Sequence, residues 1–149
     1  MASWLKKLFQ TGHAPETDKA KHNAVLEPNS SPALDVHAAI QAHIAWKQRL
    51  EDLLATDTRD GLDPLHVCRD DQCALGKWIH GDDAERYVHS EAYKRLRTAH
   101  ADFHQAAAKV IILAQAGDDE HAREELHTGA FAHASAKVKR ELARIGLDG

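Results

Sequence analysis

Apolar residues recur along two long segments of the chain with the spacing of one buried helix face. From Val36 to Leu53, and again from Tyr93 to Ala114, apolar or aromatic side chains return at alternating intervals of three and four residues. This spacing is typical of an amphipathic helix, whereas a half-buried strand alternates at every second residue. The sequence has no strand pattern and no internal repeat, and it therefore predicts an all-α fold.

Capping and breaking residues set the expected limits of the first helix. Ser31 is a suitable N-cap and Pro32 suits the first helical position, so we expect the helix to begin there. The breaker-rich segment TDTRDGLDP should end it near residues 56–61. Residues 62–87 then form a long connection in which CALGKWI predicts one short helix. A connection of this length inside a domain is usually functional.

Three further helices are expected in the second half of the chain. Ser90 is a plausible N-cap for a long helix that stops at Gly117, and a shorter helix should cover residues 118–127. After a break at residues 128–129, a last helix should reach the end of the chain. The pattern therefore predicts an antiparallel four-helix bundle over residues 32–147, with an additional short helix in the long first connection.

The first 31 residues differ in composition from the rest. Residues 11–31 are polar and rich in helix breakers, so residues 1–31 are interpreted as a flexible N-terminal extension. Residues 1–10, MASWLKKLFQ, combine four large apolar side chains with two lysines. They are either a short amphipathic helix that touches a membrane surface or a partner, or a frayed terminus. With so few lysines, any membrane contact should be weak and peripheral.

Composition and charge exclude several classes of partner. With 149 residues, 43% of them hydrophobic, the chain can bury a core as one domain. A formal net charge of −4 offers no basic excess to a phosphate backbone, so we expect no nucleic-acid partner. The sequence contains no apolar run long enough to predict a transmembrane segment, and its start is too polar for a signal peptide. Two cysteines form no disulfide framework, so the expected compartment is the cytoplasm.

Histidines stand out among the 149 residues, with 12 in the chain. His43 and His100 fall on the predicted buried faces, where the pattern otherwise has apolar residues. His104 follows His100 by one helical turn and lies on the same flank. A single buried histidine is usually satisfied by a hydrogen bond, but three imidazoles that face one bundle interior are suited to hold a metal.

The segment CALGKW suggests a fourth metal ligand. One thiolate with three imidazoles suits tetrahedral Zn²⁺, whereas magnesium and calcium prefer oxygen ligands. Cys73 should lie at the start of a short helix, where backbone N–H groups favour the thiolate. Gly76 would allow close backbone approach. Trp46 and Trp78 suit an apolar wall around the site, and they equally suit an ordinary core.

These pieces together resemble a known family. The pattern His43-x-x-Trp46, then Cys73-Ala-Leu-Gly76-Lys-Trp78, then His100-x-x-x-His104 is similar to the CZB, or chemoreceptor zinc-binding, domain of bacteria. The resemblance covers about residues 33–147. It implies a four-helix bundle, often dimeric, that binds zinc through one cysteine and three histidines. Matched piece by piece, the implied ligands are His43, Cys73, His100 and His104.

The resemblance also implies a role in signalling. CZB domains are usually attached to chemoreceptors or diguanylate cyclases, where they sense zinc, or sense oxidants such as hypochlorous acid through the zinc-bound cysteine. We therefore expect a homodimer that senses zinc or oxidant through Cys73 and serves a chemoreceptor or a cyclic-di-GMP signalling protein. We expect a stand-alone member, because the sequence has no coiled-coil signalling helix and no cyclase domain.

Three other interpretations compete with a sensor. A purely structural zinc site would have the same composition. A metallohydrolase is disfavoured because HADFH lacks the glutamate of H-E-x-x-H, and four protein ligands leave no open position on the metal. A di-iron bundle needs two Glu-x-x-His pairs, and the sequence has only Glu124–His127. We therefore expect no enzymatic activity.

The residues around the predicted site leave some roles open. Cys68 is either a bystander or a resolving thiol for an oxidised Cys73. His66, in the same loop, is interpreted as a plain loop histidine. A carboxylate is expected to accept the second N–H of a ligand histidine, and Asp35, Glu51 and Asp102 are the candidates.

Overall fold

The computed structural model describes residues 34–147, and its regular elements are all helical within that range. The predicted extension over residues 1–31, with its amphipathic start, lies outside the described residues, as do Ser31 and Pro32. Among the described residues, no helix has both the length and the apolar character needed to span a bilayer.

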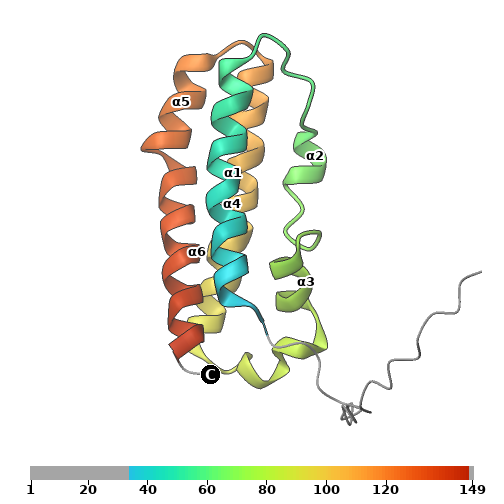
Figure 1. Ribbon diagram of the computed structural model, residues 1–149, viewed down its shortest axis with the longest axis vertical. Coiled ribbons are helices and arrows are strands. Elements are labelled where there is room, and N and C mark those ends of the chain that lie inside the picture. Colours follow the sequence, from blue (N-terminus) through green and yellow to red (C-terminus); the bar gives the residue numbers. More distant parts are fainter. Residues whose placement is uncertain (1–33, 148–149) are drawn as a thin grey trace, which may run out of the picture. The chain divides into compact units, whose positions relative to one another are not determined.

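The helices lie in roughly parallel columns, and successive columns along the chain run in opposite directions (Figure 1). In chain order they are α1 (Val36–Ala55), α2 (Pro64–Val67), α3 (Ala74–His80), the 3₁₀ helix η1 (Asp82–Tyr87), α4 (Glu91–Gln115), α5 (Asp119–His127) and α6 (Ala130–Leu147). Helices α1 and α4 run beside each other, α5 and α6 follow one another along one side, and α2 and α3 lie on the other side. The expected all-α class is therefore confirmed.

Helix α1 begins later than the sequence predicts. Its N-cap is Asp35, whose carboxylate accepts the backbone N–H of Ala38 at 2.9 Å. The first helical residue is therefore Val36 and not Pro32, because a carboxylate cap satisfies N–H groups that a helix leaves free at its start. The helix ends at Ala55, as the breaker segment predicts.

The long connection contains three short elements instead of one. The predicted helix is α3, but α2 and η1 were not expected. Helix α2 spans only four residues and is started by Asp63, whose side chain accepts the N–H of Leu65 at 2.9 Å, with Pro64 in the first turn. So short an element carries no periodic apolar pattern, which is why the sequence does not reveal it.

The second half of the chain follows the predicted limits. The hydroxyl of Ser90 accepts the N–H of Tyr93 at the start of α4, and Gly117 leaves the helical path with a φ of 80°. Helices α5 and α6 are separated at residues 128–129, as expected. Helix α4 lies at the centre of the core. Its side chains pack with those of α1 and α6, and the largest fully buried apolar residues include Leu50, Leu96, Phe103, Phe131 and Leu142.

Candidate metal centre

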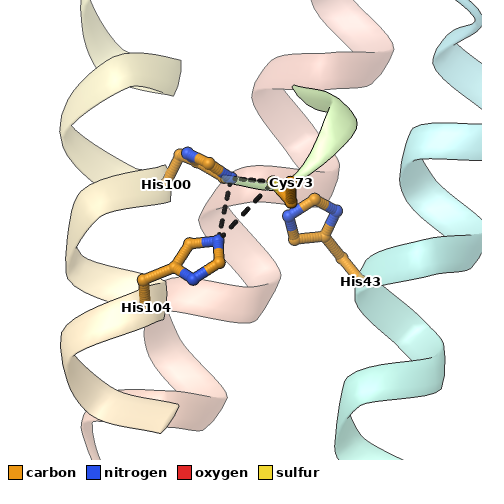
Figure 2. A group of neighbouring side chains, drawn as sticks. All are labelled: His43, Cys73, His100 and His104. Atoms are coloured by element: carbon orange, nitrogen blue, oxygen red, sulfur yellow. Dashed lines mark hydrogen bonds between the residues drawn. The ribbon is translucent and has the colours of Figure 1, made fainter. Parts of the chain in front are cut away.

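Four side chains from three helices converge inside the domain (Figure 2). His43 comes from α1, Cys73 from the N-cap of α3, and His100 and His104 from successive turns of α4. One donor atom of each residue lies within 4.8 Å of the donor atoms of the other three. The structure thus brings together the four residues that the sequence singles out as zinc ligands.

The distances between the donor atoms of Cys73, His100 and His104 suit a tetrahedral ion. The Sγ of Cys73 lies 3.3 Å from Nε2 of His100 and 3.7 Å from Nε2 of His104, and the two nitrogens are 3.2 Å apart. Zinc bonds of ordinary length, arranged tetrahedrally, would place two nitrogens about 3.3 Å apart and a nitrogen and a sulfur about 3.6 Å apart. These three donor atoms therefore have the spacing of a zinc site, the donor atom of His43 lies within 4.8 Å of each of them, and the chemistry of all four fits that metal.

Two of the imidazoles are oriented by backbone carbonyls. Nδ1 of His43 donates to the carbonyl of Ala39 at 2.7 Å, and Nδ1 of His104 donates to the carbonyl of Val67 at 2.8 Å. Because a carbonyl only accepts, the proton lies on Nδ1, and the lone pair of Nε2 is free for a metal. The residue before the C-cap of α2 thus positions a predicted ligand on α4.

The expected carboxylate partners are absent from these contacts. Asp35 caps α1, Glu51 faces Lys47 at 3.9 Å, and Asp102 is exposed. Backbone carbonyls take the role predicted for a carboxylate, because a turn of α1 and the end of α2 pass close to the rings. Nδ1 of His100 is buried and has no hydrogen-bond partner among the described residues, so only the Nε2 side of that ring makes polar contacts, with Cys73 and His104.

Burial keeps the three imidazoles neutral. It lowers the pKa of His43 and of His104, and it lowers the pKa of His100 to about 3, where the neighbouring His104 and His43 add to the effect. Neutral imidazole is the form that binds a metal. The site therefore presents three nitrogen lone pairs at pH 7 without first losing protons from the rings.

Cys73 behaves differently from the expectation for a helix start. The backbone N–H of Gly76 does point at its Sγ, at 3.3 Å, and this contact favours the thiolate. Burial outweighs it, however, and raises the pKa of the Cys73 thiol. Without a cation nearby the residue is a thiol at pH 7, so a bound metal would have to displace its proton.

Gly76 fixes where Cys73 sits. A Cβ atom at this position would lie 1.7 Å from the backbone oxygen of Asp70 and 2.8 Å from its carbonyl carbon. The turn before Cys73 therefore passes directly over the first turn of α3, and only glycine leaves room for it. The close approach predicted at Gly76 is present.

The aromatic surroundings differ in part from the predicted wall. Trp78 is buried against the rings of Tyr87 and Tyr93, and Trp46 is half-buried beneath the guanidinium of Arg49. The ring packed on His43 is that of Phe103, with centroids 4.9 Å apart. Its place on the buried face of α4 was evident from the apolar spacing, but its contact with a predicted ligand was not.

Both cysteines are free and half-buried. The thiol of Cys68 donates to the carbonyl of Leu65 at 3.2 Å, so its hydrogen bond stays within α2. His66 is exposed and lies in helix α2 instead of a loop, and it is not among the four convergent residues.

One known family matches the segment that holds this site. The sequence model of the chemoreceptor zinc-binding domain matches residues 43–111, a segment that begins at His43 and contains all four convergent residues. Residues 43–111 thus match the chemoreceptor zinc-binding (CZB) domain family. The CZB family is a family of zinc-binding signalling domains and is not a known enzyme family. Comparison with curated proteins and with solved structures gave no match.

Proposed function

We propose that this CZB domain is a sensory module in which His43, Cys73, His100 and His104 hold one Zn²⁺. The observation that carries the proposal is the spacing of the donor atoms, from 3.2 to 3.7 Å between Sγ and the two Nε2 atoms of α4. Four protein donors leave no open position for a substrate, which supports a regulatory site over a catalytic one.

Cys73 is the ligand to which we assign sensing. Its residue is half-buried while the three histidines are buried, so Cys73 is the predicted ligand most open to a small oxidant. Hypochlorous acid oxidises a thiolate by two electrons, giving a sulfenic acid on Sγ and releasing chloride. The oxidised sulfur is a poorer metal ligand. It is also a poorer acceptor for the N–H of Gly76, so the start of α3 changes together with the site.

A purely structural zinc site is the alternative. Buried structural thiolates are inert, and the partial exposure of Cys73 favours the sensor. Zinc itself is the second candidate signal, because its binding would join α1, α3 and α4 at one point.

The proposal extends to fold and assembly. The alternating columns support an antiparallel four-helix bundle in which α5 and α6 share one column. By resemblance to other CZB domains, we infer a cytoplasmic homodimer that acts on a chemoreceptor or a cyclic-di-GMP signalling protein.

Elemental mass spectrometry tests the metal assignment. Wild type should hold one zinc per chain, and His100→Ala should hold none. His133→Ala, which alters an exposed histidine on α6, is the control and should keep its zinc. Little metal in wild type after zinc has been offered would refute the site.

A second measurement separates the sensor from the structural site. Zinc released by hypochlorous acid is followed with a zinc-binding dye in wild type, Cys68→Ser and Cys73→Ser. We expect release from the first two proteins, while Cys73→Ser should bind zinc more weakly and lose oxidant-driven release. Zinc that stays bound in oxidised wild type would favour the structural alternative.

A further inference from the structure

A groove away from the zinc site runs between α2, α4 and α6. Its larger hollow has a volume of about 710 Å³, and its lining includes Leu65, Ala106, Ile112 and Ala134. Leu65 is 78% exposed and Ile112 is 55% exposed, which is unusual for such large apolar side chains. Small alanines form the floor, so a partner could come close to the backbones of α4 and α6.

A second, charged hollow continues the first. It has a volume of about 360 Å³ and shares Asp102 and Lys137 with its neighbour. The two hollows together are lined by five basic residues, Lys94, Arg95, Lys109, Lys137 and Arg140, and by two acidic ones, Asp102 and Glu141. The groove is thus locally basic on a chain whose net charge is −4.

Part of this basic charge has no partner in the fold. Arg95 is bonded to Glu141 at 3.1 Å, and Lys109 is paired with Glu125. By contrast, no ion pair within residues 34–147 involves Lys137 or Arg140. These two cations lie on one exposed stretch of α6 at the edge of the groove.

We propose that this groove binds an amphipathic helix from a partner protein, with its apolar face on Ile112 and Leu65 and acidic residues facing Lys137 and Arg140. The lining of α4 extends from Lys94 to Ile112, which is about 27 Å along a helix axis. That length suits a helix of about 18 residues. Exposed apolar residues on a concave surface, bordered by a net excess of one charge, are the features of helix-in-groove recognition.

The chemistry of the groove favours this occupant over a nucleic acid. A phosphate backbone would leave Leu65 and Ile112 unused. An acidic amphipathic helix uses both the apolar and the basic parts. The inference goes beyond the proposed zinc function, because no predicted zinc ligand lines the groove.

Two designed peptides of about 18 residues test the inference. Both peptides carry leucines on one face of the helix. The positions beside that face are glutamates in one peptide and lysines in the other. Binding is measured by fluorescence anisotropy to the full-length chain, to Ile112→Glu, and to the double variant Lys137→Glu/Arg140→Glu. Ile44→Glu is the matched control, because Ile44 is 45% exposed on α1 and lies outside the groove. Circular dichroism verifies that each variant is folded.

We expect the glutamate peptide to bind wild type at least tenfold more tightly than the lysine peptide. Ile112→Glu should weaken that binding at least tenfold, Ile44→Glu should leave it unchanged, and the double variant should reverse the preference. Equal binding of both peptides, no binding of either, or full binding to Ile112→Glu would overturn the inference. A wild-type dimer that Ile112→Glu converts to a monomer in sedimentation experiments would also overturn it, because a second copy would then fill the groove.

Discussion

Substituting Gly76 by alanine should damage the zinc site without touching any predicted ligand. The added Cβ would lie 1.7 Å from the oxygen of Asp70 and 3.1 Å from Cα of Asp71. Both are backbone atoms, so no side chain can rotate away. To reach an ordinary contact distance of about 3.4 Å, the turn over α3 must move by about 1.7 Å. Cys73 follows this turn directly and moves with it.

The size of that displacement decides the expected effect. Zinc–ligand distances tolerate changes of about 0.2 Å, far less than the turn must move. We therefore expect Gly76→Ala to lower zinc affinity by about 10–100-fold, the usual range for residues that support metal ligands. Overpacking of this kind should also lower the free energy of unfolding of the metal-free protein by about 1–3 kcal/mol.

Both effects can be measured on one set of proteins. Zinc affinity is obtained by competition with a chelating dye, and stability is obtained by urea titration in the presence of a chelator. Gly61→Ala is the control, because a Cβ atom there meets nothing within 4 Å. If Gly76→Ala bound zinc within twofold of wild type and kept its stability, the close approach to Asp70 would not position Cys73.

Three further predictions concern the core and the metal. Glu141 is buried, which alone would raise its pKa, but hydrogen bonds from Arg95 and Arg144 outweigh burial and lower that pKa. Its stabilising effect is therefore present above the ordinary glutamate pKa of about 4.3 and lost as pH falls through the lower folded-state value. Glu141→Gln should cost about 1–3 kcal/mol of unfolding free energy at pH 7. This cost should shrink as the pH falls below about 4.3, and a cost in urea titrations that does not change with pH would contradict the prediction. Phe103 is fully buried between His43 and Phe131. Phe103→Ala should therefore lower the free energy of unfolding by about 3–5 kcal/mol and weaken zinc binding. A loss of unfolding free energy below about 1 kcal/mol would show that its ring does not support the site. Free zinc at a hundred times its dissociation constant should stabilise wild type by about 2.7 kcal/mol in thermal or urea unfolding, and an equal gain in His100→Ala would place the zinc elsewhere.

Periodicity predicts the long helices well because each has one buried face. Helix α4 follows the predicted limits, from the cap at Ser90 to the break at Gly117. The start of α1 was predicted wrongly because several residues in the same segment are able to cap a helix. Ser31 and Asp35 are both good caps, and only the three-dimensional contact of Asp35 with Ala38 decides between them.

The predicted ligands could be recognised in the sequence, but the groups that orient their rings could not. His43 and His100 interrupt an apolar face, and a polar interruption is visible in sequence. The groups that orient the rings are the carbonyls of Ala39 and Val67, and every residue has a carbonyl. The sequence therefore favoured carboxylates as the acceptors for the histidine N–H groups, because their side chains can be recognised in it. The fold uses backbone carbonyls instead, and these leave no mark in the sequence.

The position of the four donors along the chain divides them into one local pair and two distant residues. His100 and His104 are four residues apart, so a single turn of α4 brings them together before any long loop has closed. Cys73 precedes His100 by 27 residues, and His43 precedes it by 57. Closing the longer loop costs only about 0.7 kcal/mol more, because loop entropy grows with the logarithm of length. Formation of α4 thus supplies the local half of the site, and Cys73 and His43 join it at nearly equal entropic cost although their distances along the chain differ about twofold.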